Sequence, residues 1–369
     1  MRRQDKPGLI VRQKMPLNLE YQFATLTDWI VPSHQFYVRN HFPTPELHEA
    51  EWRLRVSGAV TRPTEFTLSQ LRAMPVANLT AVMECAGNGR VFYEPPKEGL
   101  QWQSGAVGNA AWTGVLLRDL LAEAGVDSEA AEVVLIGADR GVVDGGKKTA
   151  SPGPIAFARS LPLRKAMSDG SLLAYDMNDE PLSTEHGYPL RAVVGGWFGM
   201  AWVKWISEIR VVERPFLGYW QGRDYFRWDR SLGEPMLVPL SEMEVKAQIA
   251  RPVQGATVPL GRPCRVFGAA WSGEAEIDKV EISTDDGVDW QPARLIGPNT
   301  PYGWRLWEYE WIPPHGGRHR LRARAVDRAG NVQPDGQLLD RESYAANWVA
   351  PVEVTAIVEN AAPAEEFVI

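Results

Sequence analysis

Apolar and polar residues alternate in short runs along most of this chain, and long helical patterns are few. Residues 68–75 and 112–126 carry leucines at the three- and four-residue spacing of an amphipathic helix, and Gly125 lies where a helix C-terminal glycine is expected. Residues 132–139 and 188–199 are apolar runs that lead into glycines, which is typical of buried strands. The pattern predicts mixed α+β structure in this part of the chain.

The pattern changes at about residue 245. From there, short alternating runs are separated by turn sequences such as Asp285-Asp286-Gly287 and Gly316-Gly317, at the regular spacing expected of a β-sandwich. We therefore predict two domains: a mixed α+β domain over residues 1–244 and an immunoglobulin-like β-sandwich with a C-terminal tail over residues 245–369. The predicted fold class is α+β and rich in β structure.

Composition narrows the class of protein. With 369 residues and 44% hydrophobic content the chain is long enough for a large core, and its 33 glycines and 28 prolines favour a loop-rich fold with more strand than helix. The net charge of -7 includes no basic run, so we expect neither nucleic acid nor an anionic membrane surface as a partner. No apolar run has the length of a membrane span or a signal peptide. We expect a cytoplasmic protein, or a periplasmic one if this is a trimmed mature form.

The candidate chemistry begins with a cysteine. The chain has 2 cysteines, too few for a disulfide framework, and Cys85 follows the apolar run 79–83 and enters a loop that reads CAGNGR. Glycines let backbone amides turn toward one centre, which favours an anion such as a thiolate. Arg90 adds a positive charge that would lower the pKa of the thiol further if it lies close in space.

Several interpretations of Cys85 compete. It could be a buried core cysteine, a nucleophile, a redox thiol or a metal ligand. A redox dithiol needs a second cysteine in reach, whereas Cys264 lies far away in a predicted strand, where we expect a small core residue. A zinc site needs three or four ligands, and the 6 histidines are scattered without ligand spacing. If Cys85 binds a metal, most other ligands must come from a non-protein group.

The loop CAGNGR resembles the cysteine loop of the sulfite oxidase family, in which the cysteine is the protein ligand of molybdenum and a pterin dithiolene supplies two more sulfurs. Other segments resemble the same family in the same order, and they span most of residues 36–225: FYVRNHFPTP (36–45), GLQW (99–102), LLAYDMNDEPLSTEHGYPLR (172–191), VKW (203–205) and WQGRDY (220–225). The sandwich then resembles the family's dimerisation domain, which implies a homodimer.

The resemblance implies a set of residues that bind the molybdenum–molybdopterin cofactor. Cys85 would be the metal ligand, and Asp139 resembles a family aspartate at the pterin. Arginine forks and a lysine suit a phosphate, and paired donors and acceptors suit the edge of a pterin. The remaining implied cofactor-binding residues are Tyr37, Val38, Arg39, Asn40, His41, His186, Arg191, Trp202, Val203 and Lys204.

The resemblance also implies a pocket for a small oxyanion beside the metal. Arg39 and Arg90 stand at positions of substrate-binding arginines, and Arg341, seven residues before Trp348, resembles a third that comes from the second domain. Trp102 would line the pocket, and Tyr225 would lie near the metal's oxo group.

The implied activity is oxidation of sulfite to sulfate. No haem-binding CxxCH motif occurs in this chain, so we expect electrons to leave to an external acceptor, whose identity is unknown, or to dioxygen. The sequence departs from the family at Met200-Ala201 and at Phe226, where basic residues are usual. These departures leave alternatives open: nitrate or sulfoxide reduction, oxidation of a sulfane carrier, or a non-catalytic cofactor-binding protein.

Overall fold

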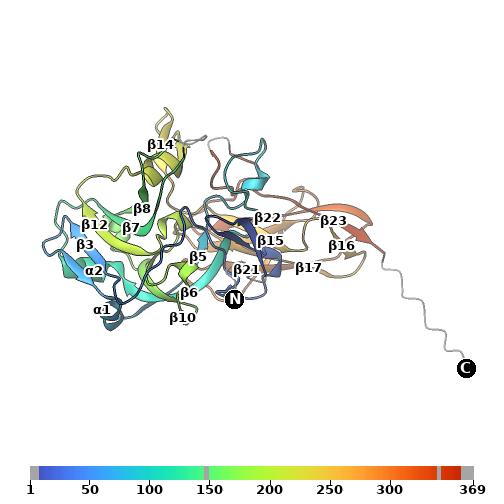
Figure 1. Cartoon of the computed structure of the whole chain (residues 1–369). Coiled ribbons are helices and arrows are strands. Elements are labelled where there is room, and N and C mark those ends of the chain that lie inside the picture. The colour runs from blue at the N-terminus through green and yellow to red at the C-terminus, as the bar shows by residue number, and fades with distance from the viewer. Residues whose placement is uncertain (1–7, 145–148, 339–341, 359–369) are drawn as a thin grey trace, which may run out of the picture.

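The computed structural model describes residues 8–144, 149–338 and 342–358. Figure 1 shows the sandwich strands at one end of the molecule and the α+β part at the other, with β5 (Ala77–Glu84) and β6 (Val107–Leu116) between them. The β-rich α+β class predicted from the sequence is confirmed. Among the described residues, no helix is long and apolar enough to cross a membrane.

One sheet of the α+β part leads directly into the cysteine loop. Its order is β10-β9-β6-β5, with β11 paired to β9, and β5 runs antiparallel to β6 from Ala77 to Glu84. Helices α1 (Leu68–Ala73) and α2 (Leu117–Ala124) contact β6. The other strands of this sheet are β9 (Ser171–Met177), β10 (Glu180–Pro181) and β11 (Arg191–Val194).

A second sheet carries Asp139 and the segment that follows the VKW motif. Its order is β4-β3-β12-β7-β8, in which β12 is parallel to β3 and antiparallel to β7. Its strands are β3 (Leu54–Gly58), β4 (Thr64–Phe66), β7 (Glu132–Gly141), β8 (Ile155–Pro162) and β12 (Ile206–Val212), and the short helix α3 (Leu163–Ala166) follows β8. Two hairpins complete this part: β1 (Leu9–Gln13) with β2 (Asn18–Tyr21), and β13 (Phe226–Asp229) with β14 (Met236–Pro239).

The C-terminal part is a two-sheet sandwich, as predicted. One sheet has the order β15-β17-β21-β20 and the other β16-β23-β22-β18-β19. Cys264 is only half-buried at the start of its strand, so the prediction of a buried residue was too strong there. The strands are β15 (Lys246–Arg251), β16 (Ala256–Pro259), β17 (Cys264–Trp271), β18 (Ile277–Ser283), β19 (Gln291–Pro292), β20 (Arg294–Ile296), β21 (Arg305–Trp311), β22 (Gly317–Asp327) and β23 (Val352–Ile357).

The two parts share a hydrophobic core. Phe267, Trp271 and Trp304 belong to the sandwich, yet they pack in the same buried cluster as the strands of the α+β part. A separate, smaller cluster fills the space between the two sandwich sheets. The sandwich is therefore packed against the cysteine-bearing sheet through apolar contacts, which fixes their relative position.

Both predicted helices exist, but α1 ends two residues earlier than expected and α2 begins five residues later. Gly125 ends α2 in the left-handed conformation, with φ of 69°, as its position predicted. Residues 112–116, predicted to be helical, instead form the end of β6. There they pair with β5 and β9 on either side, and an aromatic and β-branched stretch such as Trp112-Thr113 packs well in a strand.

Candidate functional site

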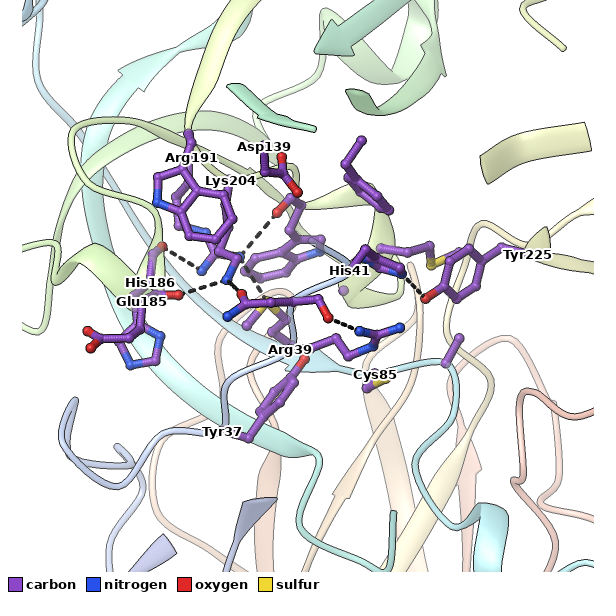
Figure 2. A pocket seen from close by; sticks show the side chains of 18 residues that line it. Tyr37, Arg39, His41, Cys85, Asp139, Glu185, His186, Arg191, Lys204 and Tyr225 are labelled. Carbon is purple, nitrogen blue, oxygen red and sulfur yellow. Dashed lines mark hydrogen bonds between the residues drawn. The ribbon is translucent and has the colours of Figure 1, made fainter. Parts of the chain in front are cut away.

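A cavity lies in the α+β part where the cysteine loop, residues 37–41 and the loops around β11 and β12 meet. Figure 2 shows the side chains that line it. The lining includes eleven of the residues proposed from sequence: Tyr37, Arg39, Asn40, His41, Cys85, Asp139, His186, Arg191, Trp202, Lys204 and Tyr225.

Residues 36–41 are held by the N-terminal hairpin. Val38 and Leu19 exchange two backbone hydrogen bonds, of 2.9 and 2.8 Å, so this stretch is extended. Tyr37, Arg39 and His41 then reach the cavity, while Val38 is buried away from it. The Arg39 guanidinium donates to Asn18 Oδ1 at 3.3 Å and to the carbonyl of Asn40.

Cys85 lies at the end of β5 with its backbone fixed on both sides. Its N–H donates to the carbonyl of Ala106 at 2.8 Å, and its carbonyl accepts from the N–H of Asn88 at 2.8 Å. Burial raises the pKa of the Cys85 thiol, and the opposing effects of Arg39, the Gly87 amide and Arg90 are smaller. Arg90 and the Gly87 amide do lower the pKa of the thiol, as the sequence predicted, but the predicted net lowering is wrong for the protein alone, because burial outweighs the positive charges. A metal cation would supply the charge that a thiolate needs here.

A second group in the cavity consists of the motif residues His186, Arg191 and Lys204 (Figure 2). Arg191, at the start of β11, donates to the carbonyls of His186 at 3.0 Å and Trp202 at 3.2 Å. Lys204 donates to the carbonyl of Glu185 at 2.8 Å and to the Asn40 side chain. Backbone carbonyls thus hold both cations in place without neutralising them.

No salt bridge within the described chain neutralises the positive charges of the cavity, although Asp139 lies close enough for its charge to act on Lys204. Among those residues, Arg39, Arg191 and Lys204 form no ion pair with a carboxylate. Burial lowers the pKa of Arg191 to about 10, and burial together with the Arg191 charge lowers the pKa of Lys204 well below its usual value. Buried cations are costly unless an anion completes them, so the cavity suits an anionic group.

Asp139 lines the cavity from β7, and its predicted place at the pterin stays a prediction. It is buried, and burial raises its pKa to about 7, although the charge of Lys204 opposes the shift. A neutral carboxyl group at this position can donate one hydrogen bond and accept another, which suits the edge of a heterocycle.

Tyr225 closes the cavity beside His41. Its hydroxyl lies 2.6 Å from Nε2 of His41, and the His41 ring stacks on Phe157 with ring centroids 4.3 Å apart. Burial raises the pKa of Tyr225, so its hydroxyl stays protonated. A single π-helical turn, Trp220–Asp224, precedes it.

Arg90 ends the cysteine loop and is not part of the cavity lining. Its Nε donates to the carbonyl of Ser343 at 2.9 Å and its Nη1 to the carbonyl of Leu100 at 2.7 Å. Two glycines make room for the guanidinium: a Cβ on Gly87 would lie 2.6 Å from Nη2 and a Cβ on Gly99 would lie 2.9 Å from Nη1. Its predicted contact with substrate stays a prediction.

Other predicted residues lie behind the cavity wall or outside the described chain. Trp102 is fully buried, with its ring 6.4 Å from that of Tyr37, and its indole N–H has no partner among the described residues. Val203 is buried and, like Trp102, is absent from the described lining. Arg341 lies outside the described residues.

The cavity also contains residues that the sequence analysis missed. Trp205 belongs to the VKW motif but was not predicted to line the cavity. It has a left-handed φ of 51°, and the centroid of its ring lies 4.1 Å from Nζ of Lys204. Its place beside Lys204 was a usable signal. Phe157, which stacks on His41, lay in no motif. The other missed residues are Met83, Ala86, Glu185, Gly199 and Met200.

The donor set is poor in metal ligands apart from Cys85. Within the described ranges, no group of three or more His, Cys, Asp or Glu side chains is placed to bind a metal ion. What the cavity offers is one sulfur ligand, several cations and the flat rings of Tyr37, Trp202 and Trp205. Such a set fits a flat anionic cofactor that brings most of the metal's ligands itself.

Comparisons with known proteins indicate a cofactor of this kind. A family model described as "Oxidoreductase molybdopterin binding domain" matches residues 41–220, and one described as "Mo-co oxidoreductase dimerisation domain" matches residues 238–356. Mitochondrial sulfite oxidase of Mus musculus is 35% identical over an alignment of 350 residues, and the match covers 89% of this chain and 62% of that protein. The chain therefore spans less than two thirds of the length of that relative.

Two further relatives carry other activities in their names. Inducible nitrate reductase [NADH] 2 of Glycine max is 32% identical over 358 residues, covering 87% of this chain and 39% of that protein. The solved structure of the sulfane dehydrogenase of Paracoccus pantotrophus is 30% identical with a TM-score of 0.79, and the match covers 92% of this chain and 84% of that one.

Proposed function

The chain belongs to the molybdopterin-binding oxidoreductases of the sulfite oxidase family, and from this premise we propose that it oxidises sulfite to sulfate in the cavity beside Cys85. The observation that carries the proposal is that one cavity combines a single cysteine sulfur with Arg39, Arg191 and Lys204, three cations that form no salt bridge in the described chain. The charges suit the cofactor's phosphate and a small oxyanion substrate.

The residues of the cavity divide between the two anions. In Figure 2, Arg191, Lys204 and His186 lie on one side of the view, and Arg39, Cys85 and Tyr225 on the other. The first group would hold the molybdopterin, with Asp139 at its heterocycle. When bound, the molybdenum centre supplies two-electron oxo transfer, with Cys85 as its protein ligand.

Arg39 is the cavity arginine placed to hold the substrate. Its charge opposes the effect of burial on the pKa of the Cys85 thiol, so the guanidinium lies near the expected metal position. Asn18 and the Asn40 carbonyl fix the guanidinium, which reduces the conformational entropy lost when an oxyanion binds. The Tyr225 hydroxyl, which stays protonated, can donate to an oxygen of the anion or to His41.

The proposal also includes the role of the second domain and the acceptor of the electrons. The match of residues 238–356 to a dimerisation domain supports a homodimer. Oxidation of sulfite to sulfate releases two electrons, which would pass to an external acceptor or to dioxygen.

Variants of the two cysteines test this function. Purified wild-type protein should contain molybdenum and pterin and oxidise sulfite. Cys85→Ser should fold and retain pterin, because Arg191, Lys204 and His186 remain. Its activity should fall by roughly two orders of magnitude or more, because a hydroxyl group of similar size replaces the sulfur ligand of the metal. Cys264→Ser is the matched control, since it changes the other thiol far from the cavity and should leave turnover intact.

The outcome also separates the alternatives. Each preparation is assayed with sulfite, nitrate and a sulfane substrate, because the two further relatives carry the latter activities in their names. Full sulfite oxidation by Cys85→Ser would contradict the assignment. Molybdenum and pterin without turnover of any of the three substrates would favour a non-catalytic cofactor-binding protein.

A further inference from the structure

The residue before Cys85 is a buried carboxylate that the proposed chemistry does not use. Glu84 ends β5 and is 3% exposed. Its Oε1 accepts from Lys246 Nζ at 2.9 Å and from Asn88 Nδ2 at 3.0 Å, and its Oε2 accepts from Trp271 Nε1 at 2.8 Å. Both carboxylate oxygens are therefore held by named donors.

Two of these donors belong to the sandwich, and they come from one sheet. Lys246 begins β15 and Trp271 ends β17, and the register of these antiparallel strands pairs Lys246 with Trp271. The two side chains therefore leave the sheet at the same point, where both meet Glu84. The Lys246 ammonium is also 5.7 Å from the centroid of the Trp271 ring.

The third donor connects this carboxylate to the backbone of the cysteine. Asn88 gives its Nδ2 hydrogen to Glu84, and its Oδ1 accepts from the N–H of Ala106 at 3.1 Å. The carbonyl of Ala106 in turn accepts from the N–H of Cys85 at 2.8 Å. A chain of hydrogen bonds thus runs from the sandwich to the peptide that carries the thiol.

A buried ion pair of this kind specifies geometry more than it adds stability. Desolvation of both charges consumes most of their attraction, whereas loss of one partner leaves a buried charge that must move toward water or another donor. Because Glu84 is directly bonded to Cys85, its movement would displace the thiol. We propose that Lys246 and Trp271 are positioning residues that fix Cys85 in the cavity through Glu84.

This inference rests on the proposed function only for the role of Cys85 as metal ligand; the fixed position of the thiol is testable without that role. The chain also offers a matched control. Lys165 is another buried lysine, 8% exposed at its side chain as is Lys246, and it pairs across to Glu274 of the second domain at 2.5 Å. It also donates to the carbonyl of Gly195, away from the cysteine loop.

The experiment compares Lys246→Met with Lys165→Met, each in a Cys264→Ser background where Cys85 is the sole thiol. The rate of thiol modification by N-ethylmaleimide at one fixed pH and the molybdenum content are measured on the same purified protein. Lys246→Met should accelerate modification at least about tenfold, because the loop opens more often, and should lose molybdenum. Lys165→Met should stay within about twofold of its parent for both readouts, even where its melting temperature falls equally.

Equal modification rates in the two lysine variants would overturn the inference, because the Glu84 pair would then be no more than a general stabilising contact. If Lys246→Met does not fold, Trp271→Phe decides: it removes one N–H donor to Glu84 while keeping a ring in the core, and it should accelerate modification in the same direction. An unchanged rate in Trp271→Phe would then count against the proposal. Wild-type protein without molybdenum would contradict the proposed function and leave the comparison of rates valid.

Discussion

Arg39, Arg191 and Lys204 bring positive charge into the cavity. Arg191 and Lys204 keep their hydrogen bonds to backbone carbonyls, but their pKa values are depressed because burial disfavours the charged forms. Asp139 shows the opposite shift for the same reason. Binding of an anionic cofactor would offset the desolvation free energy of these two buried cations, so cofactor and folded protein should stabilise each other.

The shift of Asp139 predicts a pH-dependent stability. Between its ordinary pKa of 3.8 and its folded value of about 7, the folded protein holds a proton that the unfolded chain has lost. The contribution of Asp139 to stability therefore falls as pH rises through this interval. Asp139→Asn removes the loss, so relative to wild type it should gain roughly 1–3 kcal/mol between pH 5 and pH 8.

Urea unfolding of cofactor-free protein at the two pH values measures this difference. Asp335→Asn, which changes an exposed aspartate, is the matched control and should show no such trend. A difference between Asp139→Asn and wild type that is the same at both pH values would show that Asp139 titrates normally.

The cavity residues differ in how well sequence could find them. Cys85, His186 and Lys204 lie in motifs whose residue types indicate metal or anion binding, and all three line the cavity. Glu84 and Arg159 gave no such signal, although each is almost fully buried. Their roles depend on partners more than sixty residues away in the chain, which no local pattern records.

At the scale of elements, one arginine holds the segment that carries Tyr225. Arg159 in β8 is 1% exposed and donates to the carbonyls of Trp220 at 2.5 Å and Leu240 at 2.7 Å. The N–H of Leu240 donates to the carbonyl of Tyr225 at 3.0 Å. The π-helical turn and the β13–β14 hairpin are thus fixed to β8 at both ends.

Removal of this arginine should loosen the whole segment. Arg159→Met loses two charge-assisted hydrogen bonds and leaves two buried carbonyls without these donors, which should cost about 1–4 kcal/mol of stability. Turnover should fall with Tyr225 misplaced, while pterin content stays near that of wild type. Denaturant unfolding, kcat and pterin analysis measure the three effects.

Arg223→Met provides the comparison, since Arg223 lies in the same turn but is exposed. It should change neither stability nor kcat appreciably. Wild-type turnover in Arg159→Met would show that Tyr225 keeps its place without the arginine.

The helix predicted at residues 112–126 shows where element prediction reaches its limit. Leucine spacing identified α2 and its end at Gly125 correctly, but it extended the helix into Trp112–Leu116. That stretch is a strand because β5 and β9 pair with it on both sides. Periodicity reports an amphipathic face, whereas strand pairing is decided by segments distant in the chain.

At the scale of the whole molecule, the shared core predicts cooperative unfolding. Trp271 and Trp304 of the sandwich pack in the buried cluster of the α+β part, and Trp304 exchanges indole-to-carbonyl hydrogen bonds of 2.9 Å with Trp29. Separation of the two parts would expose this surface, so neither should unfold alone.

Calorimetry and far-UV circular dichroism check this expectation on the full chain. Both should report one transition at the same midpoint, with calorimetric and van't Hoff enthalpies that agree. Two resolved transitions would show that the sandwich and the α+β part unfold independently. The sequence predicted that there are two domains, but their shared core could not be foreseen, because apolar residues carry no mark of the partner against which they pack.

The contact of the second domain with the cysteine loop has a consequence for protein engineering. The N–H of Ala345 donates to the carbonyl of Ala86 at 2.7 Å, and the Arg90 guanidinium lies 4.9 Å from the centroid of the Tyr344 ring. The segment after β22 is therefore a structural part of the α+β part that carries the cavity. A chimera in which the sandwich of a relative replaces that of this chain must keep residues 343–346 of this chain. Otherwise the cysteine loop would pack against residues that differ from its own partners.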